Sequence, residues 1–273
     1  MVEIVEEPDE HQSSSSGAGS SGASSSQARP PAYSSISQYV SANTMECVLF
    51  GSRVLTVFFA INYMIPFLGL VAPESAYYKI FAASAATFAL RLHTRIQGQI
   101  AANAQFIQRL VIEDAFHYLI YSVVFLMSAP ISMAALPVTI YAALHACTFV
   151  TKILRETGHS NISIVPKLEA FTAHQTPNAL GIIACSEIFL IPLLVSMIFS
   201  GKGSLFLPFA YYRFLSLRYA SRRNPSTRQA FAQMRGSLQN VAGSPNCPGV
   251  VSAFIYRAID FISARAPPVI SLN

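Results

Sequence analysis

The sequence predicts an all-α integral membrane protein with about six membrane helices, some of which enter the bilayer without crossing it, and C-terminal amphipathic helices. Three observations predict this class. Hydrophobic residues make up 52% of the 273-residue chain and charged residues only 11%, whereas a typical soluble domain is about one quarter charged. The apolar residues are gathered in runs that could cover much of a hydrocarbon core. The positive charges cluster between these runs and at the C-terminal end.

Charge divides the chain into three parts. Residues 1–44 begin with five acidic residues, continue in serine and glycine, and predict a disordered cytosolic tail. Residues 45–221 hold the apolar runs and predict the helical membrane domain. Residues 222–273 predict a basic cytosolic tail. From Arg213 onward the chain has eight arginines against one aspartate, a balance that favours an anionic partner such as lipid headgroups.

The first predicted membrane segment is Val54–Ala72, which has 19 residues without a charge. As a helix it would cover about 28 Å. The run Ala179–Ser200, interrupted only by Glu187, predicts a second long span. Shorter apolar runs predict the remaining membrane segments: Ile80–Leu90, a hairpin of Ala115–Ala129 and Ile131–Thr151 joined at Pro130, and a final stretch that ends near Ala220.

Lysine and arginine placement predicts the orientation. With six passes and both termini in the cytosol, every cytosolic loop is basic. These loops contain Arg91, Arg95, Arg109, Lys152, Arg155 and Lys167. The opposite side receives only Lys79 and Lys202.

Two amphipathic helices are expected in the tail, at Pro225–Val241 and Val250–Ile262. In the second, apolar residues fill one half of the helical wheel, among them Phe254, Ile255, Ile259 and Ile262, while Arg257 lies on the other half. Such a helix could lie in the bilayer interface or pack against the membrane bundle, and the sequence leaves both open.

The stretch FAYYRFLSLRYASRRNP mixes arginines with aromatic rings at the end of an apolar run. Its arginines do not share one helix face, so a membrane interface is favoured and nucleic-acid binding is not. Arg213 lies deepest in the run and is expected to pair with a carboxylate or a carbonyl. The arginines predicted to contact the interface or a partner are Arg213, Arg218, Arg222, Arg223, Arg228, Arg235 and Arg257.

Polar residues inside the apolar runs are the candidates for chemistry: Glu113, Asp114, His117, His145 and Glu187. They could form a proton relay or part of a metal site, because helix bundles use such acids and histidines. Alternatively they pair with Arg91, His93 or Arg95. No catalytic motif is present, no cofactor or metal is predicted, and the four cysteines lack zinc-ligand spacing.

Several segments, among them EDAFHYLIYS, LHACTFVTKIL and YYRFLSLRYASRRNP, resemble the transmembrane protein 33 family, also called the Krüppel homolog 2 family. The resemblance runs from about Val54 to the C-terminal helix. It implies a non-enzymatic protein of the endoplasmic reticulum and nuclear envelope that works with reticulon-type membrane proteins, nuclear pores and stress-signalling partners. Three spans are often drawn for this family. The basic tail could also bind an import receptor, and a solute or proton transporter is the alternative function.

The predicted orientation can be tested at the one N-glycosylation sequon, Asn161-Ile162-Ser163. This sequon lies in a loop predicted to be cytosolic, so Asn161 should carry no glycan when the protein is made in a eukaryotic cell. The measurement is the electrophoretic mass before and after endoglycosidase treatment. A loss of mass on treatment would place the loop in the lumen and reverse the orientation.

Overall fold

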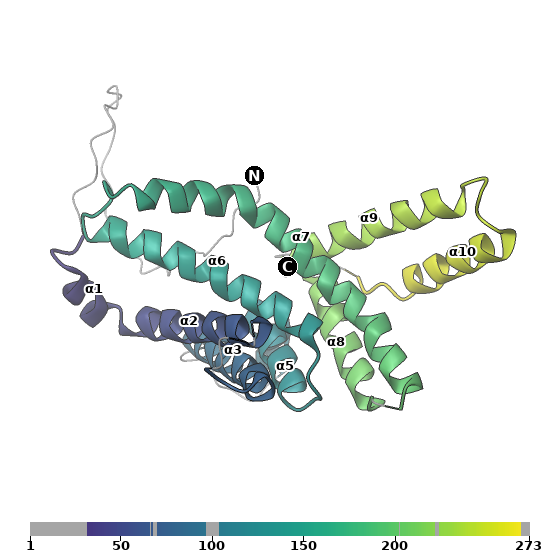
Figure 1. The fold of residues 1–273 in the computed structure, drawn as a ribbon, viewed down its shortest axis with the longest axis horizontal. Helices are drawn as coiled ribbons and strands as arrows, with labels where there is room; N and C mark the ends of the chain where they lie inside the picture. Colours follow the sequence, from purple (N-terminus) through teal and green to yellow (C-terminus); the bar gives the residue numbers. More distant parts are fainter. Residues whose placement is uncertain are drawn as a thin grey trace, which may run out of the picture.

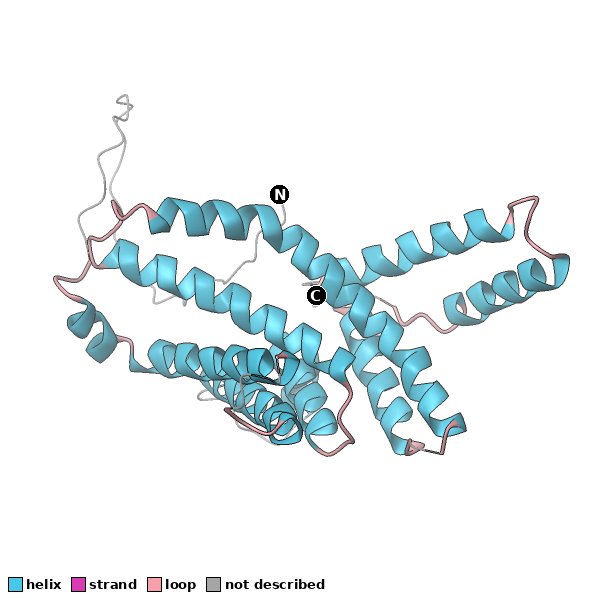
Figure 2. Ribbon diagram, in the orientation of Figure 1, coloured by secondary structure: helices cyan, strands magenta, loops and turns pink. Residues whose placement is uncertain are grey.

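The computed structural model describes residues 32–65, 67, 70–96, 104–201, 203–221 and 224–268, and within these ranges the chain is helical and contains no strand (Figure 2). The prediction of an all-α protein is therefore confirmed. The helices among the described residues are α1 (Ile36–Ala42), α2 (Thr44–Met64), α3 (Pro73–Ile96), α4 (Ala104–Ile112), α5 (Asp114–Leu126), α6 (Ser132–Glu156), α7 (Ile164–Phe199), α8 (Phe206–Ala220), α9 (Pro225–Ala242) and α10 (Gly249–Ser263).

The helices form a bundle from which the last two project. Helix α3 packs against α2 and α5, while α6 packs against α2 and α7. Helix α7 changes direction along its length and then lies beside α8 (Figure 1). It contains Pro177 and Pro192, each of which removes a backbone hydrogen bond and permits bending. Helices α9 and α10 pack on each other and extend away from the bundle (Figure 1).

Long-range contacts fix the direction of the helices. The ion pair between Lys152 and Glu46, 2.9 Å apart, joins the end of α6 to the start of α2. The hydroxyls of Tyr63 and Ser132, 2.7 Å apart, join the end of α2 to the start of α6. These two helices are therefore antiparallel. We call the side where α2 begins and α6 ends the entry face.

Three of the described helices are long and apolar enough to cross a membrane: α2, α6 and α7. Helices α5 and α8 have 13 and 15 residues, so they measure about 20 and 22 Å and are shorter than a hydrocarbon core of about 30 Å. Helix α3 is long but carries charges at both ends. The expected six crossing helices are thus not confirmed, whereas the expectation that some helices are too short to cross is met.

The first predicted span is wrong in its bounds. Helix α2 ends at Met64, eight residues before Ala72, and it begins at Thr44, ten residues before Val54. The prediction was based on a run without charges, and it therefore left out the first part of α2, which contains Glu46 and Arg53. Helix α7 likewise begins before Ala179, at Ile164.

The predicted disordered tail is wrong for its last part. Residues Ile36–Ala42 form α1, and the side-chain oxygen of Ser35 accepts a hydrogen bond from the Gln38 backbone N–H at its start. The hydroxyl of the buried Tyr39 donates a hydrogen bond to Glu46 at 2.8 Å. Burial is the larger cause, and the Glu46 carboxylate the smaller one, that raises the pKa of Tyr39 well above its usual value. This bond ties α1 to α2. Residues 1–31 lie outside the described residues.

Aromatic rings fill the centre of the bundle. Phe81 of α3 packs against Phe125 and Tyr121 of α5 with ring centroids 5.7 and 6.3 Å apart. Tyr121 in turn contacts Phe214 of α8 at 4.8 Å. These ring pairs are tilted, and aromatic pairs of this kind stabilise a core beyond the burial of their area. The aromatic cluster therefore holds three helices that are too weakly apolar or too short to be fixed by the bilayer alone.

Replacing Phe125 with alanine should lower the free energy of unfolding by about 3–5 kcal/mol, because it leaves a cavity among these rings. The measurement is unfolding of the detergent-solubilised protein in mixed micelles. Phe199→Ala is the matched control, since Phe199 is 88% exposed and its loss leaves no cavity. Equal effects of the two substitutions would contradict the assigned core.

Candidate functional site

The most buried charges of the described residues lie between α7 and α8. Glu187 is fully buried and Arg218 is 2% exposed. The Arg218 Nε lies 3.5 Å from Glu187 Oε2. Helix α8 places Tyr211, Phe214 and Arg218 on one face by their spacings of three and four residues. The face of α8 that packs into the aromatic core therefore also places the Arg218 guanidinium beside Glu187.

Helix α5 adds a second carboxylate and an imidazole. Asp114 Oδ1 lies 3.6 Å from Arg218 Nη1 and 3.6 Å from His117 Nδ1. The His117 Nε2 lies 2.7 Å from the Val111 carbonyl oxygen, and because a carbonyl only accepts, this nitrogen carries the hydrogen. The Ser221 hydroxyl also donates to Asp114, at 3.2 Å. Asp114 is 35% exposed, so the cluster reaches from the bundle interior to the surface.

Tyrosines enclose the ion pair. Tyr118 donates to the Glu187 carboxylate, and its ring lies under the Arg218 guanidinium at 4.8 Å. Arg218 Nη2 donates to the Tyr141 hydroxyl at 3.1 Å. Tyr211 donates to the Glu187 backbone oxygen at 2.7 Å. Glu187 and Arg218 thus contact α5, α6, α7 and α8, and the contacts fix the register of all four.

The arrangement is suited to holding helices together rather than to chemistry. Two buried charges are tolerated only when each is paired and hydrogen-bonded, and here each has both kinds of partner. Within the described residues, no group of three histidine, cysteine, aspartate or glutamate side chains is placed to hold a metal ion.

The structure separates the five polar residues predicted as one site. Asp114, His117 and Glu187 meet around Arg218. Glu113 instead pairs with Arg95 at 2.9 Å, which confirms, for this residue, the alternative that it pairs within the bundle. His145 is on α6 and stacks on Tyr141, with ring centroids 6.3 Å apart.

The pairing expected for Arg213 is made instead by Arg218, which is buried and lies near Glu187 and Asp114, whereas the Arg213 side chain is exposed. Distance from the tail did not identify which arginine is ion-paired. The better signal was helical spacing, since Arg218 shares the face of Tyr211 and Phe214 whereas Arg213 lies on the opposite side. Sequence reasoning also missed Tyr118 and Tyr141 as partners of the charges.

The tail arginines differ in what they contact. Arg228 donates to the Tyr219 and Ser221 backbone oxygens, so it caps the end of α8. Arg235 and Arg257 are exposed. Arg222 and Arg223 lie outside the described residues.

Helix α10 presents an unusually exposed apolar surface. Val250, Phe254 and Phe261 are 84%, 72% and 59% exposed, and Ile262 is 54% exposed. Ile259 is buried and Ile255 is half-buried, on a helix that packs on α9. The apolar half predicted for α10 therefore has two parts: one is buried against the rest of the protein, and the other is exposed.

An all-helical bundle with three apolar helices long enough to cross a bilayer, charges paired in its interior and an apolar amphipathic tail defines an integral membrane protein. Residues 28–268 match the family described as Transmembrane protein 33/Nucleoporin POM33. The chain belongs to this family.

Relatives cover nearly the whole chain. The Transmembrane protein 33 homolog of Caenorhabditis elegans is 85% identical over 271 residues, 98% of this chain and 100% of the relative. Human Transmembrane protein 33 is 40% identical over 233 residues, 85% of this chain and 94% of the relative. Krueppel homolog 2 of Drosophila melanogaster is 33% identical over 230 residues, 84% and 82% of the two chains. No solved structure matches the chain.

The ion pair can be tested by substitution. Glu187→Gln should lower the free energy of unfolding by about 3–5 kcal/mol, because it leaves the Arg218 charge buried with a weaker set of partners. Arg218→Gln should have an effect of similar size, and the double variant should lose less than the sum of the two. Unfolding in mixed micelles measures all three, with the exposed Arg213→Gln as the control. Additive losses would show that the two residues do not act as a pair.

Proposed function

We propose that the protein organises the membranes of the endoplasmic reticulum and nuclear envelope without catalysing a reaction. It would act in two ways, by inserting more volume into the cytosolic leaflet than into the lumenal one and by holding partner proteins. The observation that carries the proposal is the open apolar surface of α10, with Phe254 72% exposed, in a chain whose family description includes a nucleoporin.

The arrangement of charge supports a cytosolic tail. The last turn of α6 and the first turn of α7 carry Arg155 and Lys167, on the same side as the entry face. The opposite side, where α3 begins, carries Lys79. By the positive-inside rule the entry face would be cytosolic. Helix α8 ends beside Asp114, which begins α5, so α9 and α10 would leave the bundle on this cytosolic side.

An amphipathic helix at that position would lie in the interface with its apolar side among the acyl chains. The exposed Arg235 and Arg257 would contact anionic headgroups nearby. Because α5 and α8 are shorter than the hydrocarbon core, the membrane domain itself would also be asymmetric across the bilayer. Reticulon-type membrane proteins are the proposed partners in the membrane, and nuclear-pore or import-receptor proteins are the proposed partners of the tail.

A solute or proton transporter is the alternative. It would use Glu187, Asp114 and His117, which do lie together. Their pairing with Arg218 favours a structural role, as argued above. Vesicles reconstituted with the unsubstituted protein separate the two functions, because a transporter would carry a solute or proton flux across them and a purely structural ion pair would not.

The tail helix provides the main test. Phe254→Asp should lower membrane insertion of α10 at least about tenfold, because burying a phenylalanine side chain is worth about 1.5–3 kcal/mol. The chain has no tryptophan, so Val250→Trp gives a unique reporter whose fluorescence is quenched by brominated lipids when α10 inserts. The same Phe254→Asp protein should also form fewer narrow tubules when reconstituted in vesicles.

Ser263→Asp is the matched control, since it adds the same charge at an exposed polar position at the end of α10. It should leave quenching and tubule formation close to those of the parent protein. Equal quenching in the Phe254→Asp and Ser263→Asp proteins would contradict an interfacial α10. Normal insertion with no effect on membrane shape would leave the tail as a partner-binding element and would overturn the shaping function.

A further inference from the structure

The open face of α10 combines apolar and basic side chains. At about 100° per residue, Val250, Phe254 and Phe261 fall within about 40° of one another around the helix. The exposed Arg257 borders Val250 on this face, and the Arg265 guanidinium lies over the Phe261 ring at 3.6 Å. Acyl chains would match the apolar groups but not the arginines among them. The face therefore suits a ligand that is both apolar and acidic.

The charge of this face is unmatched in the part of the chain that the structure describes. There, Arg95, Arg155 and Arg218 each have a carboxylate partner. Neither Arg257 nor Arg265 forms an ion pair with a carboxylate of the described residues. The side of α10 that packs on the protein is a different one, because it contains the buried Ile259, about 160° around the helix from Phe261.

The chain itself contains a segment of the complementary composition. Residues 1–10 read MVEIVEEPDE and carry five of the 13 acidic residues of the protein, with no lysine or arginine. Four apolar residues are interspersed with the acids. These ten residues lie outside the described part of the structure. Their sequence supplies both of the chemical properties that the open face of α10 requires: Met1, Val2, Ile4 and Val5 are apolar, and Glu3, Glu6, Glu7, Asp9 and Glu10 are acidic.

The structure shows where this segment joins the bundle. The backbone N–H of Tyr33 donates to the carbonyl oxygen of Glu156 at 3.0 Å, at the end of α6 and therefore at the entry face. Helix α9 packs on α7 where Ala230 meets Ala184, which is 20 residues, or about 30 Å, along α7 from its start. Helix α10 runs back from the far end of α9 toward the bundle (Figure 1).

The connection between the two is of suitable length. Residues 11–32 number 22, of which twelve are serine or glycine. For a chain of this composition the root-mean-square span is about 5–6 Å times the square root of the length, here about 26 Å. This span is close to the distance along α7. A linker that matches the separation of its two ends gives an effective concentration in the millimolar range, so even a weak contact would be populated.

We propose that residues 1–10 bind the open face of α10 in the same chain. The apolar residues of the segment would cover Phe254 and Phe261, and its glutamates would pair with Arg257 and Arg265. The contact itself does not depend on the proposed function. Its consequence does rest on that function, since the segment would cover the surface assigned there to the bilayer. Anionic lipids would displace the segment, because they offer acyl chains and negative charge together.

The experiment uses the full chain in vesicles of phosphatidylcholine, with p-benzoylphenylalanine in place of Phe254. After irradiation, mass spectrometry of the monomer band should find cross-links to residues 1–10. Glu6→Arg with Glu7→Arg should lower the cross-linked fraction about three- to tenfold, because two exposed charge pairs are reversed. Adding Arg257→Glu and Arg265→Glu should restore much of it, since the charges are then exchanged rather than lost.

Two controls locate the contact. The same photoreactive residue in place of Phe199, which is 88% exposed at the end of α7, should give no cross-link to residues 1–10. Arg235→Glu reverses an exposed arginine of α9 and should leave the cross-linked fraction unchanged. Cross-links from position 254 to lipid alone or only to a second chain would overturn the proposal, as would a yield unaffected by the glutamate substitutions.

A separate measurement distinguishes this contact from the insertion of α10. In the Val250→Trp protein, Glu6→Arg with Glu7→Arg should increase quenching by brominated phosphatidylcholine, because the competing segment is weakened. Cross-links to residues 1–10 without quenching in either protein would support the contact and contradict an interfacial α10. Strong quenching that the glutamate substitutions leave unchanged, with no such cross-link, would keep the interfacial α10 and overturn the contact.

Discussion

The arrangement of the membrane domain depends on the ion pair between Glu187 and Arg218. In a bundle surrounded by acyl chains, apolar packing alone distinguishes poorly between neighbouring registers of two helices, because lipid is as apolar as the core. A buried carboxylate is different, since it is strongly destabilising unless one particular donor reaches it. Sliding α8 by a single residue along α7 would turn Arg218 away from Glu187. The charges therefore specify the register, and the aromatic rings around them supply the packing.

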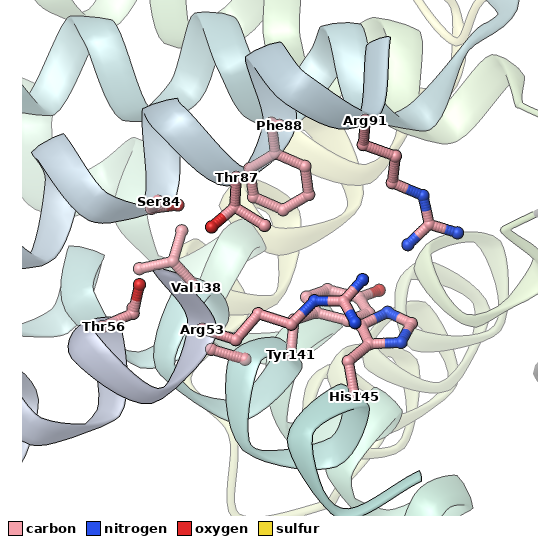
Figure 3. Close-up of a pocket in the computed structure, with 10 residues that line it drawn as sticks. Arg53, Thr56, Ser84, Thr87, Phe88, Arg91, Val138, Tyr141 and His145 are labelled. Atoms are coloured by element: carbon pink, nitrogen blue, oxygen red, sulfur yellow. The ribbon is translucent and has the colours of Figure 1, made fainter. Parts of the chain in front are cut away.

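Tyr141 connects this pair to a second polar region between α2, α3 and α6 (Figure 3). Its hydroxyl accepts from Arg218, and its ring stacks on His145. The polar interior of the bundle is thus continuous across α6.

The fold class, the presence of the two tail helices and the hairpin region could be predicted because they follow from apolar content and helical periodicity, which are local properties. Helices α9 and α10 match the predicted Pro225–Val241 and Val250–Ile262 within two residues at each end. The start of α2 could not be found in the same way, since Glu46 and Arg53 are satisfied by residues far along the chain or inside the bundle. The choice of Arg218 over Arg213 was available from spacing, but its partners Asp114 and Glu187 come from two other helices and required the tertiary structure.

The short helices explain why the polar centre lies away from the middle of the bundle. Asp114 is the first residue of α5 and Arg218 is two residues from the end of α8, so the cluster lies near the ends of both, toward the entry face. Charges there remain within reach of water through the partly exposed Asp114, which lowers the cost of burying them. Helix α10 leaves the bundle on the same side. If that side is cytosolic, as proposed, the open apolar surface of α10 adds cross-section to the cytosolic leaflet only. A bilayer relieves such a difference in area by bending toward the leaflet with less protein, and this is the physical step by which the proposed insertion of α10 would shape a membrane.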